Sequence, residues 1–281
     1  MSSAFGTRAT AAIAVLLTPS SAMAQASAPA DQRPKWAVQI APGECTLLHT
    51  TGGSDPSLFR LKTDVGTETY FLSLAGSEVR AVAPVMIQPV EVRIDGKVKA
   101  RRYGSPSRRP ELGFDRLFHV TSVPRPAIDA AAAGETLEVR SPAGTIATIE
   151  VAGGAKAFGA FRACEADQLV EWGADPEQFQ PGGTTPVIKD RDRLLPQAQL
   201  NRIKYSGVLP HTEHYLVISA GGVVEKCSAV HELPGSDMEQ VVCTYLAGRR
   251  IGEPARAPSG KAVRGVITIQ PPPASWTGER L

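Results

Sequence analysis

Histidine and cysteine are the residues of this chain whose types and spacing come nearest to a chemical site. His211 and His214 form the only close histidine pair, and on a helix this spacing would bring both imidazoles to one metal ion. Pro210 and the strand-like sequence that follows argue against a helix, and no third ligand lies nearby in the sequence. We therefore expect no metal site, and no pattern indicates another cofactor.

Local motifs of catalysis are also missing from the sequence. Neither G-x-S-x-G nor H-E-x-x-H occurs, and His49, His119 and His231 are isolated from one another along the chain. Isolated histidines are typical of the surface or of a hydrogen-bonded core. A catalytic set is then conceivable only if the fold assembles it from residues that are distant in sequence.

The four cysteines predict two disulfides. An even number of cysteines in an exported chain is typical of disulfide bonding, and none of the four has the CxxC spacing of a metal site. Three pairings are open. We favour Cys45–Cys164 with Cys227–Cys243, because each pair then stays inside one expected domain.

Basic residues are spread along the chain, and the formal net charge is only +2. This balance argues against a nucleic-acid-binding protein. The densest run, residues 97–109 (KVKARRYGSPSRR), has six basic positions among thirteen. A solvated hairpin loop explains this run, and contact with an anionic lipid or sugar polymer is the alternative.

The elements that would position these residues begin after an export signal. Within residues 1–24, Arg8 precedes the apolar run 9–17, and the sequence AMA at 22–24 offers a cleavage site. The run is much shorter than the ~20 residues of a spanning helix. We expect a periplasmic mature protein without a membrane span and with a flexible start at 25–35. An uncleaved anchor or a disordered N-terminus is the alternative.

Residues 36–173 are expected to form a β-rich domain. Short β-type runs cover 36–40, 45–50, 58–63, 69–74, 79–87, 90–94, 97–102, 114–123, 136–140 and 145–151. Asp95-Gly96 predicts a hairpin turn between two of these runs. Strands this short and this closely spaced predict a sandwich-like or curled antiparallel sheet.

Helical periodicity interrupts this β pattern at residues 155–172, and a shorter helix is expected at 128–133. The face of the longer helix that we expect to pack on the sheet carries Phe158, Phe161, Cys164, Leu169 and Trp172.

The rest of the chain predicts a linker and a small second domain. Residues 174–197 are rich in glycine and proline and are interpreted as the linker. In the expected domain at 198–270 we predict strands at 214–220, 223–230 and 263–269 and a helix at 237–247 that Ser236 caps. Residues 271–281 are expected to be an unstructured tail. The fold class is therefore α+β.

The stretch 223–269 resembles the C-terminal domain of TonB-type energy transducers. The resemblance is carried, in order, by VVEKCSAV, GSDME, a helix with Cys243, Arg249-Arg250, EPAR at 253–256, GKAV at 260–263 and a closing strand. Tyr205 with Pro210 would correspond to the opening Tyr-Pro of that family. The resemblance covers about 70 residues, counted from the range 198–270, and implies a β-hairpin, a helix and a further strand.

The family also implies a function, with departures. A transducer has an N-terminal membrane helix and a long proline-rich spacer, whereas this chain has a cleavable signal and a β-rich region. The resemblance thus implies a module that binds protein or peptidoglycan, not energy transduction. The candidate partner-binding residues are Arg249, Arg250, Arg256 and Lys261.

We therefore expect a non-enzymatic binding or adaptor protein of the cell envelope, which contacts an outer-membrane protein or peptidoglycan. An envelope hydrolase with a site assembled from distant residues is the alternative. A third interpretation is a stress or host-interaction protein in which the β-rich domain is the active part.

Overall fold

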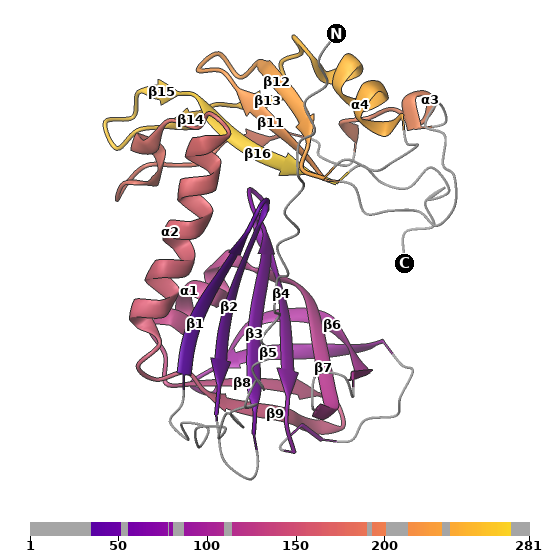
Figure 1. Ribbon diagram of the computed structural model, residues 1–281, viewed down its shortest axis with the longest axis vertical. Helices are drawn as coiled ribbons and strands as arrows, with labels where there is room; N and C mark the ends of the chain where they lie inside the picture. Colours follow the sequence, from indigo (N-terminus) through magenta and orange to yellow (C-terminus); the bar gives the residue numbers. More distant parts are fainter. Residues whose placement is uncertain are drawn as a thin grey trace, which may run out of the picture. The chain divides into compact units, whose positions relative to one another are not determined.

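The β-rich region forms one large antiparallel sheet in the computed structural model of the protein (Figure 1). The structure describes residues 35–51, 56–77, 79–80, 87–109, 114–189, 193–200, 213–231 and 237–270. The strands of the sheet are β1 (Lys35–Ala41), β2 (Glu44–Thr50), β3 (Leu58–Asp64), β4 (Thr69–Ala75), β5 (Gln88–Ile94), β6 (Lys97–Arg109), β7 (Phe114–Pro124), β8 (Thr136–Ser141) and β9 (Gly144–Glu150). Their order in the sheet is β1-β2-β3-β4-β7-β6-β5-β8-β9.

The expected α+β class is confirmed. The sandwich-like arrangement is not confirmed, because all nine strands belong to one curled sheet. The pairing of β7 with both β4 and β6 is what joins the first four strands to the β5–β6 hairpin. This pairing links segments far apart in sequence, and within the described part of the β-rich region every strand belongs to this one sheet.

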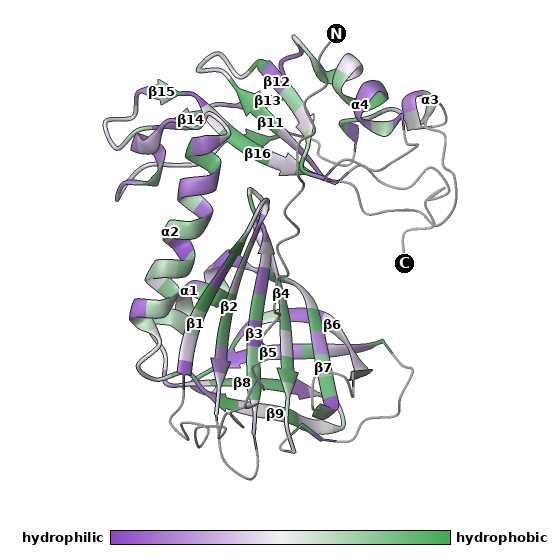
Figure 2. Ribbon diagram, in the orientation of Figure 1, coloured by the Kyte–Doolittle hydropathy of each residue, from purple (hydrophilic) through white to green (hydrophobic). Residues whose placement is uncertain are grey.

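Alternation along the strands places the hydrophobic core on one side of the sheet. Leu47 on β2 lies opposite Leu61 on β3, and Leu61 lies opposite Leu72 on β4, so three leucines form a row across the strands. All three are fully buried. Figure 2 shows the same alternation of hydrophobic and hydrophilic residues along the arrows. Burial of such rows is the main stabilising contribution of a sheet of this kind.

Helix α2 (Ala155–Glu171) packs against the start of this sheet. Phe158, Phe161 and Leu169 are buried in the core, as the helical spacing predicted. Cys164 on the same face forms a disulfide with Cys45 on β2, with Cα atoms 6.2 Å apart. The shorter helix α1 (Arg125–Ala132) begins earlier than expected, with a proline in its first turn.

The C-terminal region forms a smaller three-stranded sheet with a helix. The sheet order is β12 (Val224–Ala229), β11 (His214–Ile218) and β16 (Gly265–Ile269), and all pairs are antiparallel. Helix α4 (Met238–Leu246) packs on it through Met238, Val242 and Leu246. Cys227 on β12 and Cys243 on α4 form the second disulfide, so both favoured pairings are present. A β-hairpin, a helix and a further strand are thus found in the expected order.

Short elements occupy the segment that we interpreted as a linker and the chain after α4. They are the 3₁₀ helix η2 (Pro176–Phe179), β10 (Val187–Ile188), α3 (Gln197–Leu200), β13 (Gly252–Glu253), β14 (Ala255–Arg256) and β15 (Ala262–Val263). Strand β10 pairs with β13, and β14 pairs with β15. Part of the segment 174–197 is therefore hydrogen-bonded to residues that follow α4.

Several expectations concern residues outside those described. They include the signal at 1–24, nearly all of the flexible start at 25–35, the tail at 271–281, and Tyr205, Pro210, His211 and Ser236. Most of the run 79–87 is also outside, and its described residues 79, 80 and 87 are not in a strand.

The turn between β3 and β4 contacts the C-terminal sheet. The backbone N–H of Thr268 donates to the carbonyl oxygen of Gly66 at 3.1 Å, and the Thr268 hydroxyl donates to the carbonyl of Val65. Gly66 has φ +87°, and a Cβ atom there would lie 2.5 Å from Thr268 Oγ1. Glycine at this position is therefore required both by the backbone angle and by the close approach.

Candidate functional site

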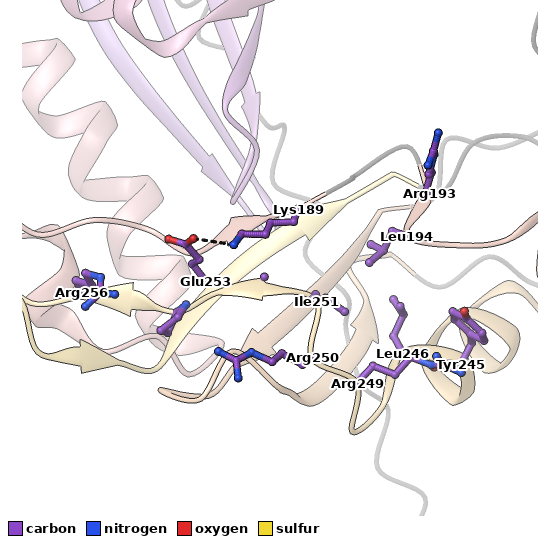
Figure 3. A pocket seen from close by; sticks show the side chains of 12 residues that line it. Lys189, Arg193, Leu194, Tyr245, Leu246, Arg249, Arg250, Ile251, Glu253 and Arg256 are labelled. Carbon is purple, nitrogen blue, oxygen red and sulfur yellow. Dashed lines mark hydrogen bonds and ion pairs between the residues drawn. The ribbon is translucent and has the colours of Figure 1, made fainter.

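An open pocket of about 830 Å³ lies in the C-terminal region (Figure 3). Its lining comes from the chain around β10 and α3, from the end of α4, and from the segment that continues through β13 to β14. The basic side chains of the lining are Lys189, Arg193, Arg249, Arg250 and Arg256. We call this site the basic pocket.

The pairing of β10 with β13 builds one wall of the basic pocket. Val187 lies opposite Glu253 and Ile188 lies opposite Gly252. A Cβ atom on Gly252 would lie 1.9 Å from the carbonyl oxygen of Val187, so only glycine permits this approach. The pairing brings Lys189 to Glu253, and Lys189 Nζ lies 3.0 Å from Glu253 Oε1.

The end of α4 builds the opposite wall. Gly248, with φ +72°, follows the last turn of the helix and directs the chain back toward β12. Arg249 then folds onto Tyr245: its guanidinium carbon lies 3.9 Å from the ring centroid, and its Nε donates to the Tyr245 carbonyl at 2.5 Å. Both contacts hold the Arg249 side chain in place without neutralising its charge.

Positive charge exceeds negative charge in the basic pocket. Glu253 is the one acidic residue of the lining, against five basic residues. The hydrogen bond and charge of Lys189 hold the pKa of Glu253 below its ordinary value. Among the residues that the structure describes, Arg193 and Arg250 have neither an ion pair nor a side-chain hydrogen bond. Positive charges that line one pocket repel one another, and an anionic ligand would reduce that repulsion.

The lining also has an apolar part. Leu194, Leu246 and Ile251 lie between the basic groups, and the Tyr245 ring adds an aromatic surface. Arginine next to apolar surface suits a ligand that has both carboxylate or phosphate oxygens and a hydrophobic part.

The structure brings together three of the four predicted partner-binding residues. Arg249, Arg250 and Arg256 all line the basic pocket, whereas Lys261 lies outside the lining on the turn between β14 and β15. Sequence reasoning missed Lys189 and Arg193, because they lie in the segment interpreted as a linker. It also missed Tyr245, although its distance of four residues from Arg249 is a signal of contact at a helix end.

His214 has no ligand-binding surroundings. The residue is fully buried, and neither ring nitrogen has a hydrogen-bond partner among the residues that the structure describes. Burial lowers its pKa to about 4, so the imidazole is neutral at pH 7. Within the described ranges, no group of three or more histidine, cysteine, aspartate and glutamate residues could hold a metal ion.

One serine–histidine contact is formed between distant strands. Ser73 Oγ on β4 lies 2.9 Å from His119 Nδ1 on β7. Ser73 is only 2% exposed, and the pair belongs to neither the basic pocket nor the second pocket described below. Serine and histidine are two of the residue types of a catalytic triad, but this serine is covered.

Comparisons with protein families, with curated proteins and with solved structures gave no match. Within the part of the chain that the structure describes, no helix has the length and apolar character needed to cross a membrane.

Proposed function

We propose that the protein is a non-enzymatic binding or adaptor protein of the cell envelope, and that the basic pocket binds an acidic group of its partner. The observation that carries this proposal is the set of five basic side chains that line one pocket with a single carboxylate. Two disulfides support a location in an oxidising compartment, to which the expected export signal would deliver the chain.

Two of the five basic side chains in the pocket make no contact that would assign them a structural purpose. Arg193 and Arg250 are exposed and contribute no described side-chain hydrogen bond or ion pair to the fold. Clusters of like charge lower stability, so their presence at a concave surface favours a role in binding. Arginine in particular binds carboxylates and phosphates through two parallel hydrogen bonds.

The proposed partner is an acidic segment of an outer-membrane protein or the carboxylate-bearing peptides of peptidoglycan. The relationship of residues 198–270 to TonB C-terminal domains is part of the same proposal, and it is carried by the sequence resemblance and by the order of hairpin, helix and strand.

A pull-down from native envelope extracts tests the proposal. The immobilised full chain should retain a partner that the double variant R249E/R250E loses, since both positions reverse charge in the basic pocket. The variant Lys156→Glu reverses one charge at an exposed position of α2 and should retain the partner, as a control for the single variants R249E and R250E. Lys261→Glu measures whether the binding surface extends beyond the pocket. Equal capture by the wild-type chain and the double variant would refute the proposal.

An envelope hydrolase is the second candidate, and the contact between Ser73 and His119 is the observation that favours it. A fluorophosphonate probe tests this candidate directly, because it labels a serine whose hydroxyl is activated by a histidine. Labelling of the wild-type chain that Ser73→Ala abolishes would establish the hydrolase. Absence of labelling on the folded chain would exclude a serine hydrolase with Ser73 as its nucleophile. We expect this result because Ser73 is buried.

A further inference from the structure

A second hollow of about 580 Å³ lies on the β-rich sheet, away from the basic pocket. It is lined by residues of β5 and β6 and by the end of β8 with the turn that follows. None of its lining residues belongs to the basic pocket. The proposed function therefore neither uses this site nor depends on it.

Three charged residues cross the hollow in one row. Glu91 on β5 lies opposite Arg101 on β6 and also opposite Arg140 on β8. Directly opposed residues on neighbouring strands share one face of a sheet, so the three side chains lie side by side. In the parallel row at the start of β5, Pro89 lies opposite Tyr103.

The arginines of the hollow carry more charge than Glu91 neutralises. Arg101 Nε lies 3.1 Å from Glu91 Oε1, but the other oxygen of Glu91 already binds Arg93 at 2.9 Å. Arg102 donates to two backbone carbonyls, from Nε to Ser122 at 2.5 Å and from Nη1 to Arg101 at 2.7 Å. These neutral acceptors fix the guanidinium and leave its charge in place.

Arg140 is the least satisfied cation of the hollow. It is exposed and has no ion pair or side-chain hydrogen bond among the described residues. Arg102 lies opposite the buried Val90 and therefore on the other face of the sheet, so Arg101 and Arg140 are the cations that share the face of Glu91. Guanidinium groups held in this way are suited to bind carboxylate oxygens through paired hydrogen bonds.

Tyr103 adds a flat apolar surface beside these charges. It is 63% exposed, so its ring is accessible to a ligand. No aromatic ring or cation among the described residues stacks on it. Pro89 and Pro142 provide further rigid apolar walls. A ring face with a hydroxyl at its edge suits a ligand with both C–H groups and polar groups, as a sugar has.

We propose that this hollow binds a glycan that carries carboxylate groups, with Tyr103 stacked on a sugar ring and with Arg101 and Arg140 bound to the acid groups. Its volume is within the ~300–1,000 Å³ that is typical of small-ligand pockets. A concave site can enclose a chain of sugars. A flat bilayer would be contacted by side chains that project from the surface and not by a hollow. Sites that bind single-stranded nucleic acid typically stack successive bases on several aromatic side chains, whereas this hollow has one aromatic ring, so a glycan is favoured over a nucleic acid.

This inference assigns a role to part of the basic run at 97–109. The sequence left two interpretations open, a solvated hairpin loop and an anionic contact surface. The whole run is strand β6, so the interpretation as a hairpin loop was wrong, because pairing with β5 and β7 extends the chain there. Lys97 and Lys99, near the β5–β6 turn, are exposed and lie outside the hollow. Arg101, Arg102 and Tyr103 line the hollow, as the second interpretation predicts.

Affinity electrophoresis of the full chain in gels that contain polygalacturonate tests the proposal. We expect polygalacturonate to retard the wild-type chain and the neutral polymer dextran to have no effect. Tyr103→Ala and Arg140→Gln should each weaken binding at least about fivefold, and both alter exposed side chains, so circular dichroism should confirm that they fold. Lys156→Gln is the matched control and should bind as the wild type does.

Four results would overturn the proposal. The first is that polygalacturonate does not retard the wild-type chain, and the second is that Tyr103→Ala is retarded as strongly as the wild type. The third is that R249E/R250E loses binding to polygalacturonate whereas Tyr103→Ala keeps it. The fourth is that phosphatidylglycerol vesicles or an oligothymidylate bind as tightly as polygalacturonate or more tightly, and that this binding also depends on Tyr103. The vesicles are included because Ile87, which precedes β5, is 72% exposed. The third result would place glycan binding in the basic pocket and leave the proposed function standing.

Discussion

Replacing Glu213 by glutamine should remove much of the pH dependence of the protein's stability. Glu213, which directly precedes β11, is buried and hydrogen-bonds to Asp64 at the end of β3. Gln270 Nε2 donates to Glu213 Oε1 at 2.5 Å. Burial, together with the hydrogen bond and charge of Asp64, raises the pKa of Glu213 to about 8, although Gln270 and Lys62 oppose the shift. Glu213 is therefore protonated in the folded protein at pH 7.

The size and sign of the effect follow from this pKa. Because the folded state holds the proton more tightly than the unfolded state, stability is greatest below the ordinary pKa of 4.5 and falls as the pH rises through 8. At about 1.4 kcal/mol per pKa unit, the upper limit of this loss is about 5 kcal/mol. Solvent at the rim of the carboxyl pair screens the interaction, so we expect a loss of about 2–3 kcal/mol.

Urea denaturation at a series of pH values measures this loss. The amide of Glu213→Gln keeps a donor for Asp64 and does not titrate, so the variant should be about 2–3 kcal/mol more stable than the wild type at pH 9 and nearly equal to it at pH 5. Glu171→Gln changes an exposed carboxylate of α2 and should leave the wild-type pH dependence intact. If Glu213→Gln shows the same fall in stability between pH 5 and pH 9 as the wild type, the carboxyl pair is not its cause.

Three further predictions concern stability, each measured by urea or thermal denaturation. Gly66→Ala should lower the free energy of unfolding by about 2–3 kcal/mol, because the new Cβ would meet Thr268. Gly96 also has a positive φ, +75°, but open space surrounds it, so Gly96→Ala should lower the free energy of unfolding by only about 1 kcal/mol. Equal losses for the two variants would refute the close-contact argument. Glu165→Ala should lower the free energy of unfolding by about 3 kcal/mol, because Glu165 is buried and accepts hydrogen bonds from Tyr70 and Arg162. Asp129→Ala removes the more exposed carboxylate partner of Arg162 and should lower it by less than about 1 kcal/mol. A larger loss for Asp129→Ala than for Glu165→Ala would contradict this assignment. Removing the Cys45–Cys164 disulfide by double serine substitution should lower the free energy of unfolding by about 4–5 kcal/mol, and removing Cys227–Cys243 should lower it by about 3 kcal/mol. The reason is that the first disulfide joins residues 119 positions apart and the second joins residues 16 positions apart. A larger loss for the second disulfide would show that loop length does not set the order.

Local features of the fold could be predicted from the sequence. Asp95 and Gly96 both have positive φ, as the two-residue hairpin turn requires, and the turn signal was correct. The helix at α2 was predicted to within one residue at its end, because its periodicity differs from that of the strands around it. The cysteine pairing was also correct, because one disulfide joins β2 to the adjacent α2 and the other joins β12 to the adjacent α4.

Long-range features could not be predicted in the same way. Nothing in the sequences of β4 and β7 indicates that they pair, yet this pairing is what makes one curled sheet. The basic pocket depends on the pairing of β10 with β13, two strands of two residues each, which are too short to show any period. Lys189 was therefore interpreted as a linker residue. In the structure, Gly252 allows β10 and β13 to approach closely, and this approach brings Lys189 to Glu253.

In-cell photo-crosslinking from the basic pocket tests the proposed function most directly. A photoreactive residue in place of Leu194, which lines the pocket, should form a defined adduct with an envelope protein or a peptidoglycan fragment. The adduct should disappear when R249E/R250E is added and persist when Lys156→Glu is added. An adduct that survives the double charge reversal, or none at all from a folded and exported chain, would contradict the proposal that this pocket binds the partner.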